Sequence, residues 1–146
     1  MTTLRMDHIV VVVDDLPAAI AFFRELGLEV ENEMDVDGPW VDCVNGIDGV
    51  RVHIVMMKAP DGSGKLELTK FHAPAATSAT PPNSTPNLLG YRSVMFEVDD
   101  IHDTVARLRP HGGELVGEIV DYQDIYRLCY LRGPAGIIVA LAESLR

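Results

Sequence analysis

The second half of the chain repeats the pattern of the first half at a constant spacing of 85 residues, and this repeat is the strongest constraint on the fold. Val13, Asp14 and Asp15 match Val98, Asp99 and Asp100. Without a gap, Ala21, Arg24, Gly27 and Glu29 then fall on Ala106, Arg109, Gly112 and Glu114. Two unrelated α+β halves that share only common strand-to-helix chemistry would not keep this register. The sequence therefore predicts two tandem copies of one supersecondary unit.

The first copy predicts the element order β-α-β-β-β. A β-branched strand runs from Met6 to Val13 and stops at Asp14 and Asp15, residue types that favour the start of a helix. Apolar residues on one face carry the helix to Gly27, a residue that favours the left-handed conformation at a helix end. Three more strands are expected, at residues 40–44, 50–57 and 65–71.

The second copy predicts the same order. Its elements are a strand at 91–98, a helix that ends at Gly112, and strands at 114–122, 126–131 and 137–141. Residues between the copies are rich in Pro, Ser, Thr, Ala and Asn, a composition typical of a linker. We therefore expect one domain over residues 1–146, with module one at 4–71, the linker at 72–90 and module two at 91–143.

Composition limits the partners of the chain. With 22 acidic and 12 basic side chains the net charge is -10, which disfavours nucleic acid and anionic membrane surfaces. Apolar runs such as Ile9 to Val13 are far shorter than the roughly 20 residues of a membrane-spanning helix. The only two cysteines, Cys43 and Cys129, are expected to be buried and unreactive. No signal-like segment opens the sequence, so a cytoplasmic location is expected.

Three motifs together resemble the vicinal oxygen chelate superfamily, which holds glyoxalase I, methylmalonyl-CoA epimerase, extradiol dioxygenases and bleomycin-binding proteins. They are Asp7-His8-Ile9 on the first strand, Leu66-Glu67-Leu68 on the fourth, and Phe96-Glu97-Val98-Asp99-Asp100 at the second strand-helix start. The resemblance implies an α+β fold in which two βαβββ modules form a cupped mixed sheet around a cleft. It also implies a homodimer, a small-molecule ligand, and a divalent metal such as Zn, Ni, Mn, Fe or Co that polarises substrate oxygens.

In that family a His on the first strand and a Glu on the fourth strand of each module typically hold the metal. Module one fills these positions with His8 and Glu67. In module two the offset of 85 places Ser93 at the His position, and alignment of Val139-Ala140-Leu141 with Leu66-Glu67-Leu68 places Ala140 at the Glu position. Catalytic metal sites usually present three protein ligands, so two make a poor site. The metal is therefore expected only if a third residue joins.

Two residues are candidates for that third ligand. Glu97 shares a strand face with Ser93 and Met95, although a solvated carboxylate is the simpler interpretation. The orientation of His53 is left open by the sequence. His8 also has two interpretations that the sequence does not separate, a metal ligand or a histidine hydrogen-bonded to Glu67 with no metal at all.

Several further residues are candidates for binding a ligand in the cleft: Ser93, Met95, Ala140, Trp40, Tyr126 and Arg127. Tyr126 and Arg127 are adjacent on one strand and therefore point to opposite faces. Only one of the two lines the cleft, where Arg would pair with a carboxylate and Tyr would hydrogen-bond a ligand.

The resemblance implies a glyoxalase-like lyase or isomerase that acts on a small oxygenated metabolite, with Glu67 and His8 as its catalytic pair. The alternative is a metal-free protein that binds a drug or metabolite. Ser93 and Ala140 favour this alternative, because small residues enlarge the cleft and remove the ion. A third hypothesis is a dimeric interaction module with neither activity.

Overall fold

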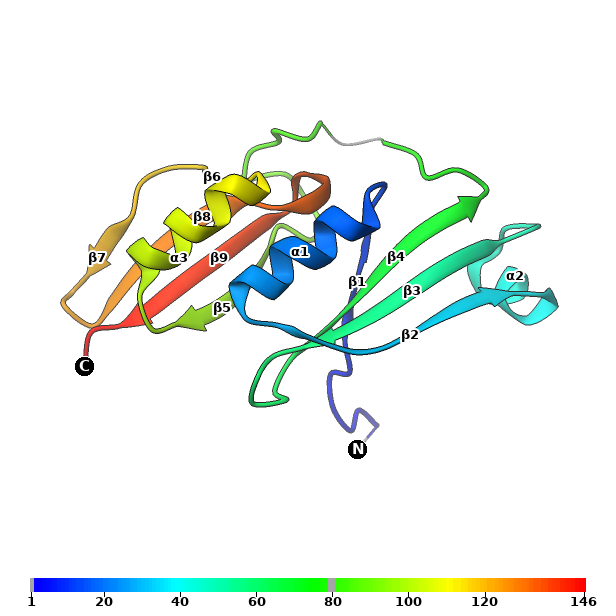
Figure 1. Cartoon of the computed structure of the whole chain (residues 1–146), viewed down its shortest axis with the longest axis horizontal. Coiled ribbons are helices and arrows are strands. Elements are labelled where there is room, and N and C mark those ends of the chain that lie inside the picture. Colours follow the sequence, from blue (N-terminus) through cyan, green and yellow to red (C-terminus); the bar gives the residue numbers. More distant parts are fainter. Residues whose placement is uncertain (1, 79–80) are drawn as a thin grey trace. The chain divides into compact units, whose positions relative to one another are not determined.

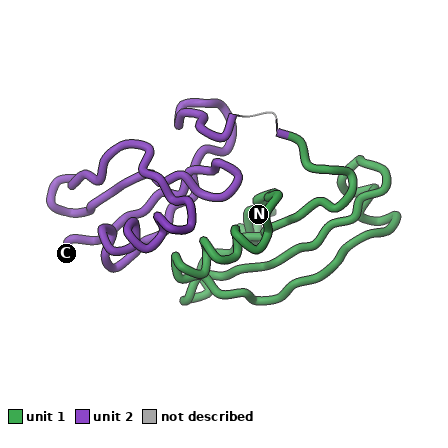
Figure 2. The backbone as a smooth tube through the Cα atoms, turned by 45° about the horizontal axis from the view of Figure 1, so that its top comes forward, with its two compact units in different colours: residues 1–77 green, residues 78–146 purple. Residues whose placement is uncertain are grey.

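The computed structural model describes residues 2–78 and 81–146 and divides the chain into two compact units, residues 1–77 and residues 78–146 (Figure 2). Each unit contains one mixed β-sheet and few helices, so the predicted α+β class is confirmed. Among the described residues, no helix is long and apolar enough to cross a membrane.

Unit 1, residues 1–77, follows the predicted order with one added helix. Its elements are β1 (Ile9–Val12), α1 (Leu16–Leu26), β2 (Glu29–Asp37), α2 (Pro39–Asn45), β3 (Arg51–Lys58) and β4 (Lys65–Ala73). The strands lie in the order β1-β4-β3-β2, as Figure 1 shows. β1 and β4, the first and last strands, pair in parallel, and the other neighbours pair antiparallel.

Unit 2, residues 78–146, repeats this topology. Its elements are β5 (Ser93–Val98), α3 (Ile101–Leu108), the 3-10 helix η1 (Arg109–His111), β6 (Glu114–Leu115), β7 (Val120–Tyr122), β8 (Tyr126–Arg132), the 3-10 helix η2 (Pro134–Gly136) and β9 (Ile138–Ser144). The strands lie in the order β5-β9-β8-β6, with β7 also paired to β8. The predicted strand at 114–122 is therefore two short strands, β6 and β7. β5 and β9 again pair in parallel.

The helix ends confirm the repeat at the level of single hydrogen bonds. Asp15 caps α1 by accepting a bond from the backbone N–H of Ala18, and Asp100 caps α3 by accepting one from Asp103. Gly27 and Gly112 end the two helical segments in the left-handed conformation, with φ of 117° and 88°. The cap residues in each pair are 85 positions apart.

The strand predicted at residues 40–44 was wrong, because this segment forms the helix α2. Pro39 occupies the first helical turn, where its missing N–H costs nothing, and Gly46 ends the helix in the left-handed conformation. The second strand of the unit is instead β2, whose side chains alternate between acidic and mostly apolar residues. At every second position, β2 carries Glu29, Glu31, Glu33, Asp35 and Asp37.

Each sheet has two different faces, and strand register assigns residues to them. In unit 1, Val11, Leu68 and Val55 lie side by side on the face that α1 covers, and all three are buried. We call this the helix-bearing face. The alternate residues occupy the opposite side, the open face, where Val10, Glu67 and Met56 form one row.

The open face of unit 1 is covered at one end. Val41 on α2 packs in a cluster with Val36 of β2, Val52 of β3 and Val50, which precedes β3. Val36 and Val52 are paired residues and lie on the same face as Met56. The remainder of the open face exposes apolar side chains, including Val10, Val12 and Met34.

In unit 2 the same rule separates the residues of neighbouring strands. Phe96, Leu141 and Cys129 share a row on the helix-bearing face, beneath α3. Met95, Ala140 and Tyr130 share a row on the open face. Apolar residues are thus retained on both helix-bearing faces, as a packed core requires.

His53 of β3 lies opposite Asp35 of β2, on the helix-bearing side of the register, with Lys70 of β4 on its other flank. Its Nδ1 lies 2.7 Å from Asp35 Oδ1 and its Nε2 lies 3.5 Å from Glu33 Oε2. The hydrogen bond to Asp35 is the main reason that the pKa of His53 is raised above its usual value of 6.5.

A raised pKa means that the folded chain holds the proton of His53 more tightly than the unfolded chain does. The stabilisation is fully present below about pH 6.5 and is lost as pH rises through the pKa of the folded state. Urea denaturation over this range should show a pH-dependent loss of unfolding free energy that His53→Gln lacks. His72→Gln, at an exposed histidine, should keep the dependence. An unchanged pH profile in His53→Gln would contradict the assignment.

Candidate functional site

The site begins with His8 and Glu67, which are distant in sequence and meet on the open face of unit 1. The parallel register pairs Val10 of β1 with Glu67 of β4, and His8 lies two residues before Val10 on the same side. His8 Nε2 lies 3.4 Å from Glu67 Oε1. This separation is long for a hydrogen bond, so the imidazole and the carboxylate face each other without a hydrogen bond of ordinary length between them.

Two further polar side chains hold this pair. Asp7 Oδ2 lies 2.7 Å from His8 Nδ1, the ring nitrogen remote from Glu67. Arg5 pairs with the other oxygen of Asp7, also at 2.7 Å. The hydroxyl of Thr69 donates a hydrogen bond of 3.0 Å to Glu67 Oε2. The bond to His8, followed by the charge of Arg5, lowers the pKa of Asp7.

Apolar residues flank Glu67 on the two neighbouring strands. Val10 lies beside it on β1 and Met56 lies beside it on β3. The side chain of Glu67 keeps 20% of its surface exposed, and that of His8 keeps 30%. A carboxylate beside an imidazole, with access to solvent and apolar neighbours, can accept a proton from a bound molecule.

Within unit 1, the residues beside His8 and Glu67 do not complete a metal site. Across residues 2–78 and 81–146, no group of three or more His, Cys, Asp and Glu side chains is arranged to hold a metal ion. His8 Nε2 and Glu67 Oε1 supply two donors, and Asp7 lies on the far nitrogen of the ring. Zinc and related ions in catalytic sites are usually held by three protein ligands.

Neither proposed third ligand joins His8 and Glu67 within unit 1. His53 lies on the helix-bearing side of β3, with both ring nitrogens directed at Asp35 and Glu33. Glu97 belongs to unit 2, where it is exposed on the open face and opposite Ala142. The sequence alone left the face of His53 open, and the register of β3 with β4 assigns it to the helix-bearing face.

In unit 2 the structure gives the positions that correspond to His8 and Glu67. Met95 pairs with Ala140 as Val10 pairs with Glu67, so Ala140 occupies the equivalent of the Glu67 position. Ser93 lies two residues before Met95, as His8 does before Val10. Met95 is exposed, whereas Ala140 is buried among its larger neighbours.

Aromatic side chains dominate the rest of this open face. Tyr126 and Tyr122 are directly opposed on β8 and β7, and Tyr130 lies beside Ala140. All three tyrosines and Met95 keep at least two fifths of their surface exposed, with Tyr126 and Tyr130 at 41%. Unit 1 also exposes an aromatic residue, Trp40 on α2, at 63%.

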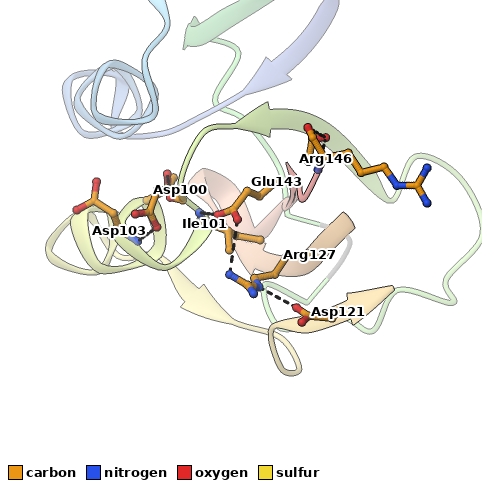
Figure 3. A network of polar contacts seen from close by, with 9 residues as sticks. Asp100, Ile101, Asp103, Asp121, Arg127, Glu143 and Arg146 are labelled. Atoms are coloured by element: carbon orange, nitrogen blue, oxygen red, sulfur yellow. Dashed lines mark hydrogen bonds and ion pairs between the residues drawn. The ribbon is translucent and has the colours of Figure 1, made fainter. Parts of the chain in front are cut away.

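Arg127 points to the other face of β8, where Figure 3 shows it in a polar network. Its Nε lies 2.7 Å from Asp121 Oδ1 on β7, and Nη1 lies 3.6 Å from Glu143 Oε2 on β9. Glu143 also accepts a 2.7 Å hydrogen bond from the backbone N–H of Ile101, at the start of α3. The bond to Asp121 raises the pKa of Arg127. This guanidinium therefore connects β7, β9 and α3 on the helix-bearing face.

Asp7 and Thr69 are the polar residues of the site that sequence reasoning did not single out. Both were visible as neighbours of the candidate pair, Asp7 directly before His8 and Thr69 two residues after Glu67 on the same strand face. Their hydrogen bonds, however, depend on side-chain rotamers that a sequence pattern does not encode.

The two cysteines differ, which corrects the prediction that both are buried. Cys129 is buried on β8, and burial raises its pKa to about 11. Cys43 is exposed, because it lies on α2 rather than on an inward-facing strand.

A thiol reagent such as DTNB should therefore modify the native chain rapidly at Cys43 and only slowly at Cys129, which is both shielded and protonated at neutral pH. Cys43→Ser should abolish the fast absorbance change, and Cys129→Ser should retain it. Fast labelling that survives Cys43→Ser would contradict these exposures.

The profile of the Glyoxalase/Bleomycin resistance protein/Dioxygenase superfamily matches residues 5–141, nearly the whole chain. No curated protein matches it.

Solved structures show the same fold. A glyoxalase family protein from Bacillus cereus is 46% identical, with a TM-score of 0.93 over 100% of this chain and 97% of that one. A glyoxalase family protein from Enterococcus faecalis is 24% identical, with a TM-score of 0.65 over 98% and 100% of the two chains. The trypanothione-dependent glyoxalase I of Leishmania major is 22% identical, with a TM-score of 0.65 over 97% and 87%.

Proposed function

Because the chain belongs to the glyoxalase/bleomycin resistance protein/dioxygenase superfamily, we propose that it is a lyase or isomerase acting on a small oxygenated metabolite through Glu67 and His8. The observation that carries this proposal is the approach of His8 Nε2 to within 3.4 Å of Glu67 Oε1 on an otherwise largely apolar open face. The four-residue arrangement of Asp7, His8, Glu67 and Thr69 supports it.

The chemistry that fits this pair is proton transfer beside a carbonyl group. Glu67 removes a proton from the carbon next to the carbonyl, and the electrons of the broken C–H bond move to form an enolate. In its doubly protonated form His8, with Nδ1–H bonded to Asp7, donates the Nε2 proton to the developing oxyanion and becomes the neutral Nδ1–H form. An isomerisation is completed when His8 Nε2 takes the proton of the hydroxyl on the neighbouring carbon while Glu67 returns its proton to the former carbonyl carbon. An elimination is completed when His8 takes back the enol proton as a leaving group departs from the carbon next to the enol double bond.

The Glu67 hypothesis predicts that Glu67→Gln lowers turnover by about 100-fold to 10,000-fold, because the amide cannot accept the proton. The assay is a panel of small α-hydroxy- and α-oxo-carbonyl compounds followed by NMR. Glu118→Gln, at an exposed carboxylate between β6 and β7, should leave turnover unchanged. Full activity in Glu67→Gln would sink the proposal.

Metal content should be measured on the same preparations. Protein purified without chelators should hold Zn, Ni, Mn, Fe or Co at well below one equivalent, since two protein donors bind such ions weakly. One equivalent of tightly held metal, lost in Glu67→Gln, would show that a ligand outside the described pair completes a metal site.

A second candidate function, metal-free binding of an aromatic drug or metabolite, is favoured by the open face of unit 2. Tyr122, Tyr126 and Tyr130 present aromatic surfaces there, and Met95 adds an adaptable apolar side chain. Ala140 and Ser93 occupy the positions equivalent to Glu67 and His8, so the imidazole–carboxylate pair of unit 1 has no counterpart there.

If this face binds an aromatic ligand, Tyr126→Ala should weaken binding about 2-fold to 10-fold, the typical loss of one aromatic contact. Bleomycin and a set of aromatic drugs, titrated by calorimetry with and without EDTA, are suitable probes. Tyr91→Ala is the matched control, because Tyr91 is 94% exposed and precedes β5. Equal weakening by both changes would argue against a site on this face.

A further inference from the structure

We propose that Asp7 and Thr69 are positioning residues, which fix the imidazole of His8 and the carboxylate of Glu67 in the relative orientation that the pair requires. This inference deepens the proposed function of His8 and Glu67 and rests on it. Neither Asp7 nor Thr69 is assigned a direct contact with substrate.

Asp7 controls which edge of the imidazole faces Glu67. Its carboxylate, 2.7 Å from His8 Nδ1, accepts a hydrogen bond from Nδ1–H, so neutral His8 carries its proton at Nδ1. Nε2 is then directed at Glu67 Oε1. Arg5, bonded to the second oxygen of Asp7, restrains the carboxylate in turn.

Thr69 controls the carboxylate of Glu67 in a corresponding way. Its hydroxyl donates to Oε2, which leaves Oε1 as the oxygen that faces His8. Thr69 is 4% exposed and β-branched, so its side chain has little rotational freedom. A buried hydroxyl with a fixed rotamer holds its acceptor more firmly than a surface residue would.

The second copy of the repeat provides an internal comparison. The positions equivalent to Asp7 and His8 are Arg92 and Ser93, and those equivalent to Glu67 and Thr69 are Ala140 and Ala142. All four polar residues are therefore missing together, although the sheet order and the parallel pairing are the same.

Positions on the helix-bearing faces behave differently. Leu66 and Leu68 of β4 correspond to Val139 and Leu141 of β9, and all remain apolar and buried. The fold has thus been kept without Asp7 and Thr69. Since they are absent where His8 and Glu67 are absent, their purpose is better explained by this pair than by strand pairing.

The experiment measures the imidazole directly, by ¹⁵N NMR of His8 at about pH 8, where an ordinary histidine is neutral. The native chain should show the Nδ1–H form, and Asp7→Asn should shift His8 toward the Nε2–H form. Asp14→Asn, at an exposed carboxylate before α1, should leave the spectrum unchanged. A His8 spectrum that is the same in Asp7→Asn and the native chain would overturn the role of Asp7.

Thr69 is tested by a double-mutant comparison of the same signal. Glu67→Gln should move the Nε2 resonance of His8 in the native background, but much less in the Thr69→Val background, where the carboxylate is free to turn. Thr69→Ser, which keeps the hydroxyl, should restore the native response. Equal responses in the Val and native backgrounds would overturn the role of Thr69. Thermal melts of all variants identify any that fail to fold.

Kinetic measurements test the roles of Asp7 and Thr69 independently of the NMR signals. Thr69→Val and Asp7→Asn should each lower kcat by about 10-fold to 100-fold with little change in KM, as expected for loss of orientation rather than of binding. If Glu67→Gln leaves turnover unaffected, the proposed function fails, and the NMR comparisons still decide whether Asp7 and Thr69 orient the pair.

Discussion

The parallel pairing of the first and last strands is the interaction on which the rest of each unit depends. In unit 1 it places β1 beside β4, and in unit 2 it places β5 beside β9. Parallel neighbours require a crossover, and the helix and the intervening strands supply it. The same pairing brings His8 to Glu67, because Val10 and Glu67 are partners in the ladder. A shift of this register by one residue would turn Glu67 into the core and Leu66 out of it.

Much of the framework could be predicted from the sequence, because most elements occur in both copies and each copy supports the prediction made for the other. Asp15 and Asp100 marked the two helix starts. The match of Val139-Ala140-Leu141 to Leu66-Glu67-Leu68 aligned Ala140 with Glu67, and the strand register agrees. The prediction failed at residues 40–44, where five residues of mixed apolar character do not distinguish a short helix from a strand. The alternation in Glu29–Asp37 was the available signal for β2, although its few apolar residues made it weak.

Of the candidate site, only the pair His8 and Glu67 could be predicted from the sequence. His8 and Glu67 follow from motif positions, and strand alternation gives their face. Asp7 and Thr69 required side-chain geometry, and the face of Arg127 required the register of β7 with β9 through β8. Duplication has preserved one face of each sheet and changed the other: unit 1 presents the pair His8 and Glu67 among aliphatic side chains, whereas unit 2 presents tyrosines around small residues. One framework thus carries two chemically different surfaces.

The acidic alternation of β2 has a consequence for how this chain associates. β2 is the end strand of its sheet, so part of its backbone has no partner strand within the unit. End strands of this kind recruit other strands unless something opposes it. β2 carries five carboxylates and no basic residue; Lys65 pairs with Glu31, and His53 lies beside Glu33 and Asp35. If two copies joined along this edge, the acidic excess of one β2 would therefore meet that of the other. Charge repulsion therefore protects the edge against sheet extension, and salt, which screens that repulsion, is the condition that weakens the protection.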